Sequence, residues 1–541
     1  MSACCERVSI HFTTQTGTPR RRRLSPYPGA HRVLKADDQP TALPRVIREI
    51  SLQFGLTVPH CHPPKTWPPS NWDHADGVSA ADNTKPEPIM HRLPRFLTES
   101  RALATLSFPI ILSQVAYTLL GMLDTVMAGR AGAEEQAAVA LGVAFWMPVF
   151  ITLMSVVQAI SPSVAQHFGA GDHAAVVQDT HEGVWLAAVS SVLPAFLMPG
   201  VAPIMRLAEI DPVLIDKTTL FLWGIVVGLP AAMIFRAIAF YSASINRPKP
   251  MMYLAFAGVG VNAFFNWLLI WGNWGFPALG GAGCGWATGI GMWVALLALA
   301  AWTAWAPEYR ACYIWRGWHW PHWSIQKRLL RIGLPMGGAA LAEVAAFTSI
   351  AVFVGRFGAS QIAAHQIALN ISSVLFMLPM GLGAALTIRV SQKLGGGDPA
   401  SARFIAWTGV AMGLVVASVA VPLILAAREL IVTAYTPDPA VREVAISLML
   451  FAAVWQLADA TQVIALGALR GYKVTLGPMI VMFVAFWVIG LPLGIRLGYH
   501  GVGSIAPMQV FGFWTGLVTA LILAAIALSG WLRTVARARM Q

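Results

Sequence analysis

The stretch RIGLPMGGAALAEVAAFTSIAVFVGRFGAS, residues 331–360, repeats a pattern that occurs earlier in the chain. A shift of 226 positions, from 108 to 334, places Phe108-Pro109 under Leu334-Pro335 and Gly129-Arg130 under Gly355-Arg356 without a gap. The same shift pairs Gly132 with Gly358, Val164 with Val390, Gln166 with Gln392, Gly169 with Gly395, Gly171 with Gly397, and Asp172 with Asp398. Self-similarity over such a length predicts two homologous halves.

Composition indicates a membrane protein. Of the 541 residues, 56% are hydrophobic and 11% are charged, whereas a soluble protein carries about 25% charged residues. The apolar residues form long runs, and many of the 21 Trp lie at run ends, where interfacial aromatic belts form. We therefore predict an all-α polytopic membrane protein.

Twelve apolar runs are long enough to cross a bilayer as helices. They cover 105–128, 136–161, 183–205, 218–240, 253–271 and 283–306 in the first half, and 334–354, 362–388, 404–426, 445–467, 478–495 and 504–531 in the second. This pattern predicts an N lobe over 96–306, a linker loop over 307–333 and a C lobe over 334–541, with six helices in each lobe.

Residues 1–95 have no such run and are rich in Pro, Arg, His and Ser, a composition that predicts a disordered basic segment. The sequence from Met90 onward resembles a natural start, and we expect the segment upstream of it to be dispensable.

Lysine and arginine in the loops predict the orientation. Counted over the loops, 18 of these residues fall on one side of the predicted spans and 7 on the other. The richer side holds both flanks of the membrane region and the linker residues Arg310, Arg316, Lys327, Arg328 and Arg331. We expect both termini and the linker to be cytoplasmic, and the two halves to be parallel repeats in a multi-pass membrane protein.

Several classes of function find no support in the sequence. The five cysteines have no paired spacing that would predict a disulfide framework or a metal site. A phosphate-binding loop, a nucleophile elbow, HExxH and paired CxxC are all absent, so we expect neither an enzyme, nor ATP-driven transport, nor a cofactor. The net charge of +12 lies mostly in the N-terminal segment and the loops and does not predict nucleic-acid binding.

Three carboxylates interrupt the apolar runs: Asp124, Glu343 and Asp459. An ionised carboxylate in hydrocarbon costs several kcal/mol when it has no partner, so each of the three is a candidate functional group. Acids inside the spans of both halves indicate a transporter.

Polar side chains share helix faces with these carboxylates or lie on neighbouring runs: Gln114, Tyr117, Asn262, Asn266, Gln366, Asn370, Trp455, Gln456 and Gln462. Helical spacing places them in stripes that would line a polar cavity, although any one of them could instead join two helices by a hydrogen bond. Arg236 lies near the end of a predicted span, and we expect its side chain to reach the cytoplasmic interface.

Three segments carry a resemblance to a known family: LLGMLDTVMAGRAG at 119–132, the run from Leu341 to Gly395, and QLADATQVIALGALRGYK at 456–473. They resemble the MATE (multidrug and toxic compound extrusion) transporters, NorM-type bacterial branch, over about Met90 to Arg533. The resemblance implies two six-helix lobes around a central cleft. It also implies secondary antiport: export of cationic amphipathic drugs in exchange for Na⁺ or H⁺.

The resemblance also assigns roles to residues. It implies a cation site, possible for Na⁺, at Glu343 and Asp459, and an N-lobe acid at Asp124 with Asn262, Asn266 and Thr288 beside it. The chain departs from the branch at Trp455, where we expect Tyr, because an indole offers a π face but no oxygen ligand.

Two alternatives remain. A flippase for a lipid-linked precursor would need a strongly cationic cavity, whereas the intramembrane charges are mostly acidic. A membrane-embedded enzyme would need a catalytic cluster at one depth, and His365, the histidine within a predicted span, has no acid near it in sequence. We expect small cationic substrates and membrane lipids as partners, no nucleic acid, and a monomer.

Overall fold

A computed structural model describes residues 89–501 and 506–540, and the side chains from residue 93 onward. Within these residues, twelve helices are long and apolar enough to cross a membrane, which confirms the predicted all-α architecture. The predicted disordered segment lies outside the described residues up to position 88.

The N lobe contains the first six spans. They are α2 (Ile89–Ala131), α3 with α4 (Ala133–Val157, Ile160–Gly169), α5 with α6 (His173–Ser190, Leu193–Leu207), α7 (Pro212–Ser244), α8 (Lys249–Trp271) and α9 (Ala282–Trp305). Helix α7 packs against α9, and α8 packs against both α2 and α9, so these helices form one bundle.

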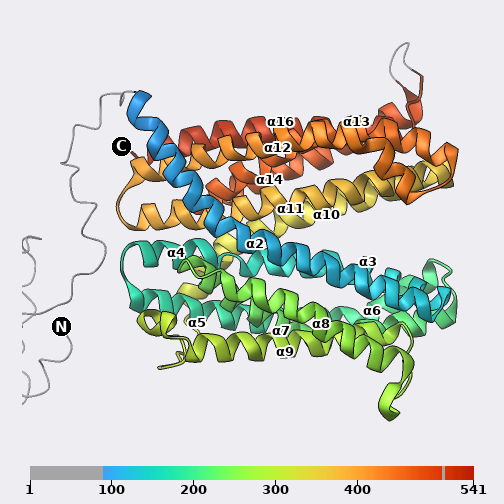
Figure 1. The fold of residues 1–541 in the computed structure, drawn as a ribbon, viewed down its shortest axis with the longest axis horizontal. Coiled ribbons are helices and arrows are strands. Elements are labelled where there is room, and N and C mark those ends of the chain that lie inside the picture. Colours follow the sequence, from blue (N-terminus) through green and yellow to red (C-terminus); the bar gives the residue numbers. More distant parts are fainter. Residues whose placement is uncertain (1–88, 502–505, 541) are drawn as a thin grey trace, which may run out of the picture. The chain divides into compact units, whose positions relative to one another are not determined.

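The C lobe repeats this order. Its spans are α10 (Trp323–Val354), α11 (Ala359–Gly395), α12 (Pro399–Tyr435), α13 (Pro439–Gly471), the segment Leu476–His500 and α16 (Val510–Ala538). The segment Leu476–His500 consists of α14 (Leu476–Phe483), η5 (Val484–Gly490), α15 (Leu491–Ile495) and η6 (Arg496–His500). Helix α13 lies at the centre, packed against α11, α12 and α16. Figure 1 shows the two bundles in different colours, from blue to green for the N lobe and from yellow to red for the C lobe.

The repeat extends to the helix starts. Asp172 caps α5 by accepting a hydrogen bond from the Ala175 amide at 3.0 Å, and its copy Asp398 caps α12 by accepting one from Ser401 at 2.9 Å. A side-chain oxygen at this position satisfies an amide that has no partner within the helix, which is worth about 1 kcal/mol. The aspartates that match between the halves therefore fix where corresponding helices begin.

The lobes meet through pairs of corresponding helices. Helix α2 packs against α11, and its copy α10 packs against α3. Helix α4 crosses α11 at the end of the two bundles where the linker lies, which we call the linker end. A Cβ atom on Gly169 would lie 1.9 Å from the Gln392 carbonyl oxygen there. A Cβ atom on Gly395 would lie 1.8 Å from the Gln166 carbonyl oxygen. All four residues are repeat partners, so the crossing is symmetric and depends on glycine at both positions.

The linker is shorter than expected and is fastened to the N lobe. Helix α10 begins at Trp323, so the last part of the predicted loop is the first part of a helix. The Glu182 carboxylate, buried on α5, accepts hydrogen bonds from the His322 amide at 2.7 Å and from Gln326 Nε2 at 2.6 Å. Buried Asp179, on the same helix, forms an ion pair with Arg328. The linker and the start of α10 are thus held on α5 by charge-assisted hydrogen bonds.

Replacing Glu182 tests this attachment. We expect Glu182→Ala to destabilise the folded protein by about 2–3 kcal/mol, because the amides of His322 and Gln326 lose a buried partner. The measurement is thermal unfolding of the purified chain in a lipid nanodisc. The control is Glu308→Gln, which removes an exposed ion pair with Arg247 and should cost under about 1 kcal/mol. Equal unfolding temperatures for Glu182→Ala and Glu308→Gln would contradict the attachment.

Replacing Gly395 tests the crossing of α4 and α11. We expect Gly395→Leu to keep the lobes apart at the linker end, because its side chain would overlap the Gln166 backbone. Spin labels at the exposed positions Ala174 and Ala400 should report longer distances in this variant than in the unsubstituted chain. The control is Gly200→Leu, since a Cβ atom on Gly200 meets nothing within 4 Å. An unchanged distance distribution in Gly395→Leu would show that the crossing does not hold the lobes together.

Candidate functional site

The N-lobe acid lies in a hydrogen-bonded network, in which the Asn266 Oδ1 atom has no partner among the described residues. Asp124 on α2 accepts hydrogen bonds from Asn266 Nδ2 at 2.6 Å and from Thr288 Oγ1 at 3.1 Å. Asn266 Nδ2 also donates to Asn262 Oδ1 at 2.9 Å, and Asn262 Nδ2 donates to Thr288 Oγ1 at 3.0 Å. All four side chains are buried. The structure therefore brings together, from three helices, the four residues that the resemblance groups around Asp124.

Helix spacing explains this arrangement. Asn262 and Asn266 lie four residues apart on α8, so their amides stack on one face. That face packs against α2 and α9, which carry Asp124 and Thr288. Both carboxylate oxygens of Asp124 thus have donors that are supplied by its own lobe.

The C-lobe acids lie in a different environment. Asp459 on α13 is 2% exposed, and its Oδ2 atom has no hydrogen-bond partner among the described residues. Glu343 on α10 is half-buried. Phe347, four residues after it, packs on Trp455, which lies four residues before Asp459 on α13, so the two carboxylates lie on either side of the same aromatic contact. Arg470, on the linker-side end of α13, donates to Gln158 Oε1 at 3.4 Å. The C lobe therefore holds two carboxylates with at least one free oxygen.

The remaining residues of the α13 stripe are buried beside Asp459. Gln462 is fully buried; its Nε2 atom lies 3.3 Å from the Met482 sulfur, while its Oε1 atom has no partner within the described part of the chain. Gln456 is also buried. Free oxygens of Asp459 and Gln462 on one helix face are the kind of ligands that a hard cation takes.

Trp455 belongs to an aromatic cluster. Its ring centroid lies 5.4 Å from that of Phe347 and 5.1 Å from that of Trp514. The Trp514 indole donates to His365 Nδ1 at 3.1 Å, so His365 is engaged in a structural pair. Trp455 thus gives the α13 stripe an apolar wall at the position where the resemblance leads us to expect a hydroxyl.

The other predicted cavity residues are less buried and are not joined to the carboxylates by hydrogen bonds. Gln366 and Asn370 are exposed on α11, and neither forms a hydrogen bond with any described residue. Gln114 is half-buried on α2, with its Nε2 atom 3.9 Å from the Met380 sulfur of α11. Tyr117 is also half-buried, one turn further along α2.

Arg236 is wrongly placed by the sequence analysis. Its side chain is buried, 7% exposed, and its guanidinium carbon lies 4.2 Å from the centroid of the Tyr117 ring. Helix α7 continues to Ser244, so Arg236 lies about two turns from the helix end, and its side chain packs within the bundle instead of extending to solvent. The side chain is stabilised by a cation–π contact instead. The buried acids Asp179 and Glu182 were missed because they come just before the predicted span 183–205.

Comparison with known proteins identifies the family. The family model MatE matches residues 109–268 and 335–495, one match in each lobe. The probable multidrug resistance protein NorM of Chromobacterium violaceum is 41% identical over 446 residues, which are 82% of this chain and 96% of that protein. The multidrug resistance protein PmpM of Pseudomonas aeruginosa is 41% identical over 435 residues, which are 80% of this chain and 91% of that protein.

Solved structures share the fold. The eukaryotic MATE transporter AtDTX14 superposes with a TM-score of 0.73 at 18% identity, covering 82% of this chain and 98% of that one. An outward-facing multidrug resistance MATE family transporter superposes with a TM-score of 0.74 at 18% identity, covering 82% of this chain and 97% of that one. The two family matches and the full-length bacterial relatives show that the chain belongs to the MATE family, with relatives of the NorM type.

Proposed function

We propose that this protein is a secondary active antiporter that exports cationic amphipathic drugs or toxic compounds in exchange for Na⁺ or H⁺. The observation that carries the proposal is the pair Glu343 and Asp459, two carboxylates within the spans of the C lobe, of which Asp459 has an unpartnered oxygen. The names of the bacterial relatives, multidrug resistance proteins, support the same function.

The exchange follows from the electrostatics of the pair. Two like charges in a medium of low dielectric constant repel each other strongly, and each also loses its hydration. A proton, a sodium ion or an organic cation relieves this cost when it binds. Because all of these bind the same carboxylates, the arrival of the coupling cation and the presence of the drug exclude each other.

Asp124 has a separate role in this proposal. Its two oxygens already accept hydrogen bonds from Asn266 and Thr288, so a cation at Asp124 would have to share or displace these donors. Cation binding at Asp124 would therefore change the hydrogen bonds that join α2, α8 and α9, and so the packing of these helices. The residues Gln114, Tyr117, Gln366, Asn370, Trp455, Gln456 and Gln462 would line the path of the substrate, with Trp455 offering a π face to a cationic ring system.

The interface between the lobes supports alternating access. The crossing of α4 and α11 closes the linker end, and the contacts of α2 with α11 continue from there to Met377, whose sulfur lies 3.3 Å from Thr118 Oγ1. A cleft that is closed at the linker end would be open toward the opposite face. We infer that cation exchange shifts the lobes between this arrangement and one that is open at the linker end.

The proposal also covers the orientation of the chain in the membrane, its oligomeric state and its need for a cofactor. The excess of Lys and Arg on the linker side, 18 against 7, supports cytoplasmic termini and a cytoplasmic linker in a bacterial inner membrane. We propose that the protein works as a monomer and without a cofactor, since a single chain supplies the carboxylates of both lobes. A flippase for a lipid-linked precursor is less well supported, because the buried Arg236 is already engaged by Tyr117.

Neutral substitutions test the coupling role. We expect Glu343→Gln and, independently, Asp459→Asn to fold normally but lose ion-driven efflux, because the amides keep the shape and lose the charge. Glu343→Asp should retain part of the activity. The measurement is efflux of a cationic dye from proteoliposomes under an imposed Na⁺ or H⁺ gradient.

The control for this test is Glu429→Gln, which neutralises an exposed carboxylate elsewhere in the C lobe and should leave efflux unchanged. A purely structural carboxylate would tolerate the neutral substitution at a cost of about 1 kcal/mol. Wild-type efflux by Glu343→Gln under the imposed gradient would therefore remove Glu343 from the mechanism.

Thiol labelling tests the orientation. In a background without native cysteines, Ser324→Cys at the exposed start of α10 should resist a membrane-impermeant thiol reagent added outside intact cells. Thr433→Cys, exposed near the opposite end of α12, should react rapidly. The reverse pattern of labelling would mean that the linker faces outward.

A further inference from the structure

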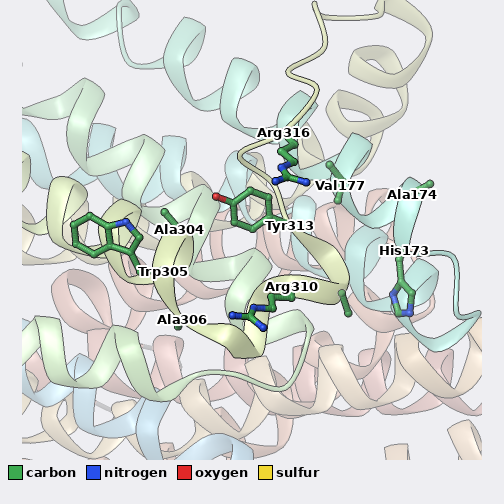
Figure 2. Close-up of a pocket in the computed structure, with 10 residues that line it drawn as sticks. His173, Ala174, Val177, Ala304, Trp305, Ala306, Arg310, Tyr313 and Arg316 are labelled. Carbon is green, nitrogen blue, oxygen red and sulfur yellow. The ribbon is translucent and has the colours of Figure 1, made fainter. Parts of the chain in front are cut away.

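A cavity of about 730 Å³ lies far in sequence from the carboxylates, where the linker meets the N lobe. Its lining comes from the start of α5, the end of α9 and the linker: His173, Ala174, Val177, Ala304, Trp305, Ala306, Arg310, Ala311, Tyr313 and Arg316. The volume is within the range of small-molecule sites, which is about 300–1,000 Å³. Figure 2 shows Arg310 and Arg316 on either side of the Tyr313 ring.

The lining is positively charged. Arg310 and Arg316 are exposed and form no ion pair with any described residue, and the lining contains no Asp or Glu. The nearest acid in sequence, Glu308, is paired with Arg247 at 3.2 Å. The guanidinium groups are therefore available to an anion, and their planar donors match two oxygens of a phosphate group.

The backbone that carries these arginines is held in place. The Cys312 carbonyl oxygen accepts a hydrogen bond from the Tyr241 hydroxyl at 2.5 Å, and the Ile314 carbonyl oxygen lies 2.6 Å from His181 Nε2. The Trp315 indole donates to Thr303 Oγ1 at 3.1 Å. These bonds fix the linker between Arg310 and Arg316, so a ligand does not have to order it on binding.

The cavity also lies at the edge of the membrane region. Helix α5 begins and α9 ends at its walls, so it lies at the linker-side ends of these two spans. Trp305 is 82% exposed there, and Trp302, one turn earlier, is 39% exposed and stacks on Tyr253 at 6.1 Å. Exposed indoles at a span end are typical of residues that lie among lipid headgroups.

We propose that this cavity binds the phosphodiester headgroup of an anionic phospholipid in the leaflet on the linker side. Arg310 and Arg316 would hold the phosphate, while Trp305, Ala304 and Val177 form an apolar wall for the start of the acyl chains. A free phosphate ion would use the arginines but would gain nothing from this apolar wall. The site is independent of Glu343 and Asp459, so it stands or falls separately from the coupling mechanism.

The test is a lipid titration of the purified full chain. After delipidation in detergent, native mass spectrometry counts bound phosphatidylglycerol and, in a parallel series, bound zwitterionic phosphatidylethanolamine. We expect the chain to prefer phosphatidylglycerol, and the double variant Arg310→Gln/Arg316→Gln to bind it at least about tenfold more weakly, because each Lys or Arg contributes about a factor of five at such a surface.

Two further variants make this result specific. Arg533→Gln/Arg537→Gln removes the same charge from exposed positions on α16 and should keep the affinity of the unsubstituted chain. Arg310→Lys/Arg316→Lys keeps the charge but loses the planar pair of donors, so it should recover only part of the affinity that the glutamine variant loses. If the double glutamine variant does not fold, the single variant Arg316→Gln, at an exposed position, should still bind several-fold more weakly.

Three outcomes would overturn the proposal. Unchanged phosphatidylglycerol binding in the Arg310→Gln/Arg316→Gln variant would exclude this cavity. An equal loss in the α16 control variant would mean that the whole charged face attracts anionic lipid without a site. Displacement of phosphatidylglycerol by inorganic phosphate at the same concentration would identify a site for a soluble anion instead of a lipid.

Discussion

A carboxylate that a helix carries into hydrocarbon loses its water and needs compensation from the protein or from a cation. The two lobes meet this constraint in different ways. Asp124 is compensated by Asn266 and Thr288, which are fixed in its own lobe, whereas Asp459 keeps a free oxygen in the lobe that also holds Glu343. Both oxygens of the N-lobe acid thus have donors without a ligand, whereas one oxygen of Asp459 is left free for a cation. Our account of exchange depends on this asymmetry between halves that are otherwise repeats.

Binding at the C-lobe pair can act on the whole chain because each lobe is a packed unit. The largest buried cluster joins α10, α11, α12, α13 and α16 and also takes in Leu103, Ala165 and Ala243 of the N lobe, whereas the next cluster lies within the N lobe, mainly on α4, α5, α7 and α9. The lobes contact each other along α2 with α11, α3 with α10 and α4 with α11, and glycine backbones touch at the last of these. Glu182 and Asp179 fasten the linker and the start of α10 to the N lobe, so α10, which carries Glu343, is held by both lobes. Cation binding at Glu343 therefore acts on a helix that contacts both lobes.

The sequence predicted features that arise from local pattern. Run length gave the twelve spans, and the cost of buried charge singled out Asp124, Glu343 and Asp459, all of which lie within helices of the described region. Features that depend on distant partners could not be predicted. Arg236 is stabilised by Tyr117 of another helix, and Trp455 by Trp514, whose positions no periodicity reveals. The start of α10 at Trp323 was missed because its first turns are amphipathic and charged, unlike an apolar run.

The central claim is that the coupling cation and the drug compete for the same carboxylates, and equilibrium binding tests it most directly. The affinity of the purified chain for a cationic dye would be measured over a range of Na⁺ concentrations at fixed pH, and over a range of pH without Na⁺. Our account predicts that the apparent dissociation constant rises with the concentration of the coupling cation in at least one series, about tenfold for each tenfold increase when one cation is displaced. A dissociation constant that stays the same in both series would contradict it.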